Sequence, residues 1–232
     1  MGARSFSGDL RAYLADGETR RAWSLAAQDG IISTAGILLG FAGAGASPAT
    51  LMIAGTAAIV AGMLTVGGAK WSETAAEREA QLRAVREERA DLRLQRGHER
   101  DQLAAHYVEK GLSTGLATEV ADALMRRSPL KAALESEHQI FRLLSQADVV
   151  ISGIGTAIAY GLGSAIPFAI AYYLPVDIEI GVIVFAVLVS LIFVSIVGAR
   201  AGNMDVPRTI LRTLAIGTVT IAVSYFVGQI AF

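Results

Sequence analysis

Acidic side chains recur on one face of a charged stretch in the middle of the chain. Glu88 and Asp91 are three residues apart, and Glu99 lies two turns further along the same run. Side chains three or four residues apart share a face of a helix, so these carboxylates could approach one ion together. Carboxylate oxygens suit Mn(II), Fe(II), Zn(II) and similar divalent ions. The spacing therefore marks a candidate metal site.

A second polar row on this stretch has a spacing of four residues and consists of His98, Gln102 and His106. Imidazole nitrogens bind several of the same metals. Arginines interleave with the acids from Arg83 to Arg100, and this pattern fits equally well a solvated helix with Glu–Arg pairs. Spacing alone leaves both interpretations open.

A single acidic residue, Asp29, interrupts the apolar stretch from Ala22 to Ser47. It would lie on the order of 10 Å inside the start of a helix. A charge at that depth in a membrane is costly unless it faces water or a partner, so Asp29 is a candidate functional residue. The alternative is an interfacial residue held by Arg20, Arg21 or a lipid headgroup.

The elements that must position these residues are predicted to be membrane-spanning helices. Of the 232 residues 53% are hydrophobic, and the mean hydropathy is +0.49. Four long stretches carry no charge: Gly30 to Ala69, Val149 to Val176, Ile180 to Ala199 and Thr213 to Phe232. A span needs about 20 apolar residues. We therefore expect an all-α membrane protein with five spans, the first stretch forming two that are joined by a hairpin at Ser47-Pro48.

A charged insert from Lys70 to Arg142 separates the second and third spans and holds all three histidines. Its composition predicts a long helix from Ser72 to about Tyr107, broken near Gly97. Two shorter helices follow in "GLSTGLATEVADALMRR" and "SPLKAALESEHQIFRLL", the second with Ser128 as its cap. The predicted organisation is an N-terminal segment 1–21, spans one and two in 22–71, a three-helix insert in 72–146, and spans three to five in 147–232.

The basic residues predict the orientation. Threaded through five spans, all 20 lysines and arginines, Arg4 and Arg11 among them, fall on one side. The other side receives the hairpin and a loop with Asp177 and Glu179. By the positive-inside rule the N-terminus and the insert are cytoplasmic, and the C-terminus lies outside. We expect a multi-pass integral membrane protein, in the plasma membrane if the source is bacterial.

Three segments together resemble the vacuolar iron transporter family: "QDGIISTAGILLGFAGAGAS", "AGTAAIVAGMLTVGGAKWSETAAERE" and "AYGLGSAIPFAIAYY". The likeness covers nearly the whole chain. It implies a homodimer with five spans per subunit that exports Fe(II) or Mn(II) from the cytosol in exchange for protons. Zn(II) and Co(II) are further candidate substrates.

The resemblance also implies roles for particular residues. Asp29 takes the place of a span-one aspartate in the family's transport path at the dimer interface, where it would bind the metal or the exchanged proton. The family's insert binds metal through residues on its three helices, and the corresponding positions here are Glu88, Asp91, Glu99, Gln102 and Glu137.

Departures from the family pattern keep a second function open. Ala58, Val66 and Ala69-Lys70 stand where relatives carry a glutamate, a methionine and a Gly-Glu pair. Fewer ligands and less negative charge would alter metal affinity, metal choice or transport itself. The alternative is therefore a non-transporting membrane scaffold, or a transporter of altered substrate.

Two other classes of function are not expected. The chain has no cysteine, and its sequence offers no convincing nucleophile–base arrangement, phosphate loop or zinc motif, so we do not expect an enzyme. The charges of the insert are balanced and few aromatic residues accompany them, so we do not expect nucleic acid as a partner.

Overall fold

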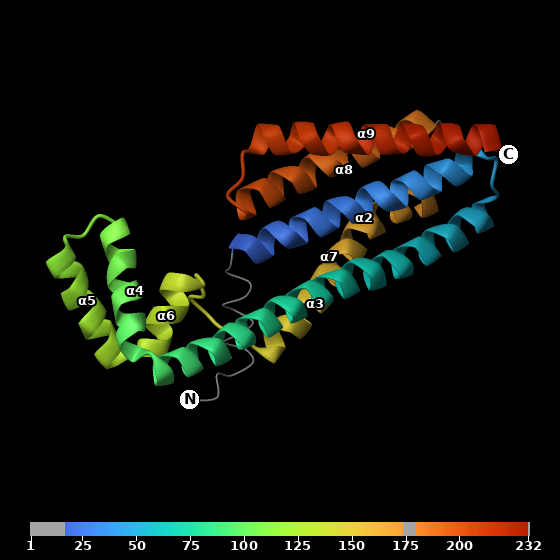
Figure 1. Cartoon of the computed structure of the whole chain (residues 1–232). Coiled ribbons are helices and arrows are strands. Elements are labelled where there is room, and N and C mark those ends of the chain that lie inside the picture. The colour runs from blue at the N-terminus through green and yellow to red at the C-terminus, as the bar shows by residue number, and fades with distance from the viewer. Residues whose placement is uncertain (1–16, 174–179, 232) are drawn as a thin grey trace. The chain divides into compact units, whose positions relative to one another are not determined.

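The computed structural model describes residues 17–173 and 180–231, and every regular element within these ranges is an α-helix (Figure 1). Five helices are long and apolar enough to cross a membrane. They are α2 (Gly17–Gly43), α3 (Pro48–Leu94), α7 (Gln146–Tyr173), α8 (Ile180–Ala201) and α9 (Val206–Ala231). The predicted all-α class is thus confirmed, and the five predicted spans correspond to five candidate membrane helices. Arg4, Arg11, Asp177 and Glu179, used to predict the orientation, lie outside the described residues.

The chain divides into two compact units, which we call the membrane unit and the insert unit. The membrane unit comprises Met1–Ser72 and Val150–Phe232, and the insert unit comprises Glu73–Val149. The insert unit contains the charged end of α3 followed by three shorter helices. These are α4 (Arg96–Glu109), α5 (Thr114–Arg127) and α6 (Pro129–Glu137).

The turn between α2 and α3 lies where the sequence predicts a hairpin. Helix α2 ends at Gly43 and α3 begins at Pro48. The backbone N–H of Thr50 donates to Ser47 Oγ at 3.3 Å, so Ser47 caps α3. Gly45 has a φ of +74°, a left-handed conformation that glycine adopts without strain.

The boundaries of the insert helices differ in two places from the prediction. The break between α3 and α4 falls at Gln95, two residues before the predicted Gly97. Helix α6 begins at Pro129 after Ser128 as expected, but it ends at Glu137 instead of continuing to Leu144. Gln139 has a φ of 55°, which a right-handed helix does not accommodate, so the chain leaves the helix there.

The segment after α6 leads to a capped start of α7. Asp148 is 1% exposed, its backbone N–H donates to Ser145 Oγ, and its carboxylate accepts from the backbone N–H of Ser145 at 2.7 Å. Arg142 Nη2 donates to the same carboxylate at 2.7 Å. The reciprocal hydrogen bonds between Ser145 and Asp148 satisfy backbone donors that the start of α7 would otherwise leave without partners.

In the membrane unit α2 packs against α8 and α9 (Figure 1). Ile31, Ala35 and Leu39 from α2 form its core with residues of the other two helices, namely Val187, Leu191 and Ile221. Ile31, Ala35 and Leu39 are four residues apart, which places them on one face of α2.

Glycine allows α2 and α7 to approach closely. A Cβ at Gly30 would lie 2.2 Å from the carbonyl oxygen of Tyr160, and one at Gly163 would lie 2.0 Å from that of Ala27. Ser164 Oγ donates to the carbonyl of Gly30 at 3.2 Å. Small residues permit this kind of backbone contact between membrane helices.

Candidate metal site

Packing between α6 and the charged end of α3 brings two of the predicted ligands together. Leu134 of α6 packs with Ala84 and Val85 of α3 in a small buried cluster. Glu88 lies one turn after Ala84, and Glu137 lies one turn after Leu134. Each carboxylate therefore follows a packed apolar residue on the same face of its helix.

Helix α4 contributes a third carboxylate to the interior of the insert unit. Leu103, one turn after Glu99, is buried with Ala121 and Met125 of α5. Arg96 Nη2 donates to the carbonyl of Met125 at 2.9 Å and ties the start of α4 to the end of α5. This anchoring explains why Glu99, in the first turn of a charged helix, is 7% exposed.

The closest approach in the site is between a carboxylate and an imidazole. Nε2 of His138 lies 3.1 Å from Oε1 of Glu88. One ligand atom from each of Glu88, Glu137 and His138 can be chosen so that all three lie within 4.8 Å of one another. Two oxygens on opposite sides of one ion, each about 2.2 Å from it, would be about 4.4 Å apart, so the group has the size of a single-ion site.

Among the described residues, no lysine or arginine neutralises the two buried carboxylates of the insert unit, Glu88 and Glu99. Glu88 is 4% exposed, and Oε2 of Glu88 and Oε2 of Glu99 are buried without a hydrogen-bond partner among the described residues. No lysine or arginine within residues 17–173 and 180–231 forms an ion pair with either of them. Buried charges left in this condition are unfavourable unless a cation or a proton compensates them.

The electrostatics of the two glutamates follow from that burial. Both lie in the charged part of the insert unit, beyond the apolar stretch of α3. Burial raises the pKa of Glu88, the hydrogen bond from His138 opposes this rise, and the charge of Glu137 adds to it. Burial also raises the pKa of Glu99, and the charges of Glu137, Glu88 and Asp91 raise it further. A divalent cation would relieve both the burial and the mutual repulsion.

The structure thus brings two of the five predicted insert ligands into one group. Glu88 and Glu137 form this group with His138. The charge of Asp91 raises the pKa of Glu88, and the charges of Glu137, Glu88 and Asp91 raise the pKa of Glu99. Gln102 is exposed on α4. The histidine of the group, His138, was missed by sequence reasoning. The signal was its position directly after Glu137, in "ESEH".

Asp29, the other predicted site residue, is in the membrane unit. It is exposed on α2, and its Oδ1 accepts a hydrogen bond from Ser33 Oγ at 3.1 Å. Among the described residues it has no ion pair, and Arg21, proposed as a holding residue, donates to the carbonyl of Gly202 instead. The next residue, Gly30, is buried against α7. Close packing of Gly30 therefore leaves the carboxylate on a free face of the helix.

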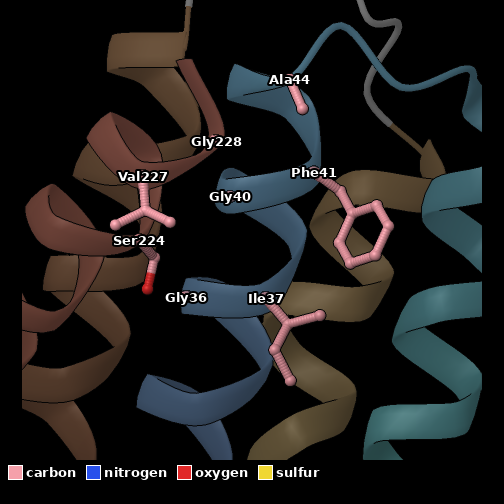
Figure 2. Close-up of a pocket in the computed structure, with 8 residues that line it drawn as sticks. All are labelled: Gly36, Ile37, Gly40, Phe41, Ala44, Ser224, Val227 and Gly228. Carbon is pink, nitrogen blue, oxygen red and sulfur yellow. The ribbon is translucent and has the colours of Figure 1, made fainter. Parts of the chain in front are cut away.

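The same helix also borders an apolar groove between α2 and α9, with a volume of about 290 Å³ (Figure 2). Gly36 and Gly40 of α2 face Ser224 and Gly228 of α9 across it. The groove is lined by no carboxylate or imidazole, so it offers nothing that would bind a metal ion.

Comparisons with known proteins cover both units. A model of the VIT family matches residues 20–229. A vacuolar iron transporter of Acanthamoeba castellanii is 28% identical over 209 residues, which are 90% of this chain and 77% of that protein. The matched region includes Asp29 as well as the carboxylate and imidazole groups of the insert unit.

Proposed function

Because this chain belongs to the VIT family, we propose that it is a transporter of divalent metal ions across the membrane that its five apolar helices span. The observation that carries the proposal is the pair of buried glutamates, Glu88 and Glu99, each with a carboxylate oxygen that has no partner among the described residues. A group of Glu88, Glu137 and His138 with the dimensions of a single-ion site adds support.

The proposed substrates are Fe(II), Mn(II) or both, with Zn(II) and Co(II) as further candidates. The name of the Acanthamoeba castellanii relative favours iron. Carboxylates together with one imidazole are compatible with each of these ions, since oxygen ligands suit manganese and imidazole suits iron and zinc.

The proposed path through the membrane includes Asp29. A carboxylate on an exposed face of an apolar helix needs a partner or water. Asp29 belongs to a row of residues spaced four apart along one face of α2. The row also contains Ser33 and three exposed apolar residues, Leu25, Ile37 and Phe41. We propose that a second copy of the chain covers this face, so that the homodimer encloses the path and Asp29 binds the metal ion or the exchanged proton.

The proposed direction is from the cytosol outward, in exchange for protons. Both the direction and the exchange follow from the resemblance to the vacuolar iron transporter family. The positive-inside rule adds only the orientation, with the insert and the N-terminus in the cytoplasm and the C-terminus outside. A site in the insert unit would then bind metal on the cytosolic side, before it enters the path. In a bacterial cell the membrane would be the plasma membrane.

Flux through reconstituted protein tests the proposal. Purified chain is inserted into liposomes that contain a metal-sensitive dye and a pH-sensitive dye, with Fe(II) or Mn(II) added outside. We expect metal uptake that is faster when the interior is acidic, accompanied by a rise of internal pH as protons leave. Metal uptake without proton movement would contradict the exchange, and no uptake of any metal by folded protein would favour the scaffold alternative.

A further inference from the structure

The imidazole of the candidate metal site comes from the end of a helix. His138 is the C-cap residue of α6, and Gln139, with its φ of 55°, ends the helix directly after it. The turn leaves the ring of His138 beside Glu88 on α3, fifty residues earlier in the chain. The side chain is 34% exposed, so an ion can reach the ring from solvent.

The hydrogen bond between His138 and Glu88 compensates only part of the negative charge at the site. Nε2 of His138 meets Oε1 of Glu88, whereas Oε2 of Glu88 and Oε2 of Glu99 remain buried without partners among the described residues. Glu137 brings a further carboxylate within reach of the same ring. One imidazole cannot compensate several carboxylates, so the arrangement has room for a divalent cation beside the ring.

The distance between His138 and Glu88 is also compatible with joint coordination. Two ligand atoms that lie about 2.1 Å from one ion are about 3.4 Å apart at the tetrahedral angle and about 3.0 Å apart at a right angle. The observed separation of 3.1 Å between His138 Nε2 and Glu88 Oε1 is close to the right-angle distance. The hydrogen bond in the metal-free protein thus holds both atoms close to the positions that an ion between them would require.

We propose that His138 is a nitrogen ligand that biases this site toward Fe(II), Co(II) and Zn(II) and away from Mn(II) and Mg(II). Imidazole suits iron and zinc, whereas carboxylate and water suit magnesium and manganese. Affinity for a nitrogen-containing site increases from manganese through iron to cobalt, so one imidazole among carboxylates separates these ions. The inference rests on the proposed function, because it specifies which ions the proposed metal site accepts.

Competition titrations of the full-length protein in lipid nanodiscs test the inference. Affinities for Zn(II), Co(II) and Mn(II) are compared in the wild type, in His138→Asn and in His106→Asn. His106 is a matched control, because it is a histidine of the same unit that lies outside the metal-sized group and stacks edge-on against Tyr107. We expect His138→Asn to weaken Zn(II) and Co(II) binding at least about tenfold and Mn(II) binding less than about threefold. We expect His106→Asn to change none of them.

A spectroscopic measurement separates coordination from a structural role. Pulsed EPR of the Mn(II)-loaded wild type is expected to show nitrogen coupling from an imidazole, which His138→Asn removes and His106→Asn retains. Equal weakening of all three metals, unchanged affinities, or no nitrogen coupling would overturn the inference while leaving the metal site intact. A wild type that binds none of these metals would overturn the proposed function, and this inference with it.

Discussion

Nε2 of His138 and Oε1 of Glu88 lie 3.1 Å apart and join the end of α6 to the charged part of α3. Glu88 is buried, Glu137 is exposed, and the charges of Glu137 and Asp91 add to the rise that burial causes in the pKa of Glu88. A protein gains no stability from placing further negative charges beside a buried carboxylate. Such a group is more readily explained by the cation that it would bind.

Removing the charge of Glu99 should stabilise the metal-free protein and reduce its response to metal. Glu99→Gln keeps the size of the side chain but removes one of the mutually repelling charges, so we expect the free energy of unfolding to rise at neutral pH. Metal at 100 times its dissociation constant should stabilise the wild type by about 2.7 kcal/mol. Thermal unfolding with and without Mn(II) or Zn(II) measures both effects.

Glu135→Gln is the matched control for that substitution. Glu135 lies in α6 and forms an ion pair with Lys131 at 3.5 Å, on the surface. Surface pairs of this kind contribute about 0–1 kcal/mol. The control should therefore keep the metal-dependent stabilisation of the wild type. If Glu99→Gln also keeps it in full, Glu99 does not contribute to the metal site.

The raised pKa values of Glu88 and Glu99 predict how stability depends on pH. Folded, metal-free protein holds protons on these groups at pH values where the unfolded chain, with an ordinary glutamate pKa of 4.5, has lost them. Stability should therefore fall as the pH rises from 4.5 through the raised values, and below 4.5 the groups should contribute no slope. Metal competes with the same protons, so metal affinity should rise over this window.

Thermal unfolding between about pH 4.5 and about pH 7.5 checks this dependence. In the metal-free protein, the double substitution Glu88→Gln/Glu99→Gln should reduce the fall of the thermal unfolding midpoint with rising pH. An identical decline in wild type and variant would mean that other groups cause it.

Gly30→Ala should destabilise the membrane unit. The added Cβ would lie 2.2 Å from the carbonyl oxygen of Tyr160, so α2 and α7 would have to separate. Overpacking of this kind typically costs about 1–3 kcal/mol. Gly68→Ala is the control, because a Cβ there meets nothing within 4 Å. Within a helix that change should be neutral or stabilising by up to about 1 kcal/mol. Equal thermal midpoints for both variants would contradict the close contact.

Much of the fold could be predicted because its signals are local. The uncharged stretches predicted five spans, and Ser128-Pro129 predicted the start of α6. The end of α6 could not be predicted, because the helical composition continues past Glu137 while the backbone turns at Gln139. A single residue in a left-handed conformation is determined by packing and has no strong signature unless it is glycine.

The candidate site was predicted in part for a related reason. Glu88 and Asp91 share a helix face, which their spacing indicates. The partnership of His138 with Glu88 spans fifty residues and depends on how Leu134 packs against Ala84 and Val85. Helical periodicity describes one helix at a time, so it could neither identify His138 nor predict that Glu99 is buried.

The most direct test of metal transport is the initial rate of Fe(II) and Mn(II) uptake into proteoliposomes with an acidic interior. Wild type, Asp29→Ala and Ser33→Ala are compared, each shown to be folded by its thermal midpoint. Ser33 donates to Asp29 Oδ1 at 3.1 Å, so Ser33→Ala disturbs the same place but keeps the carboxylate. We predict proton-dependent uptake in the wild type, loss of uptake in Asp29→Ala, and a rate within about threefold of the wild type in Ser33→Ala. Uptake in Asp29→Ala at the wild-type rate would contradict the path, and no uptake in the wild type would contradict transport itself.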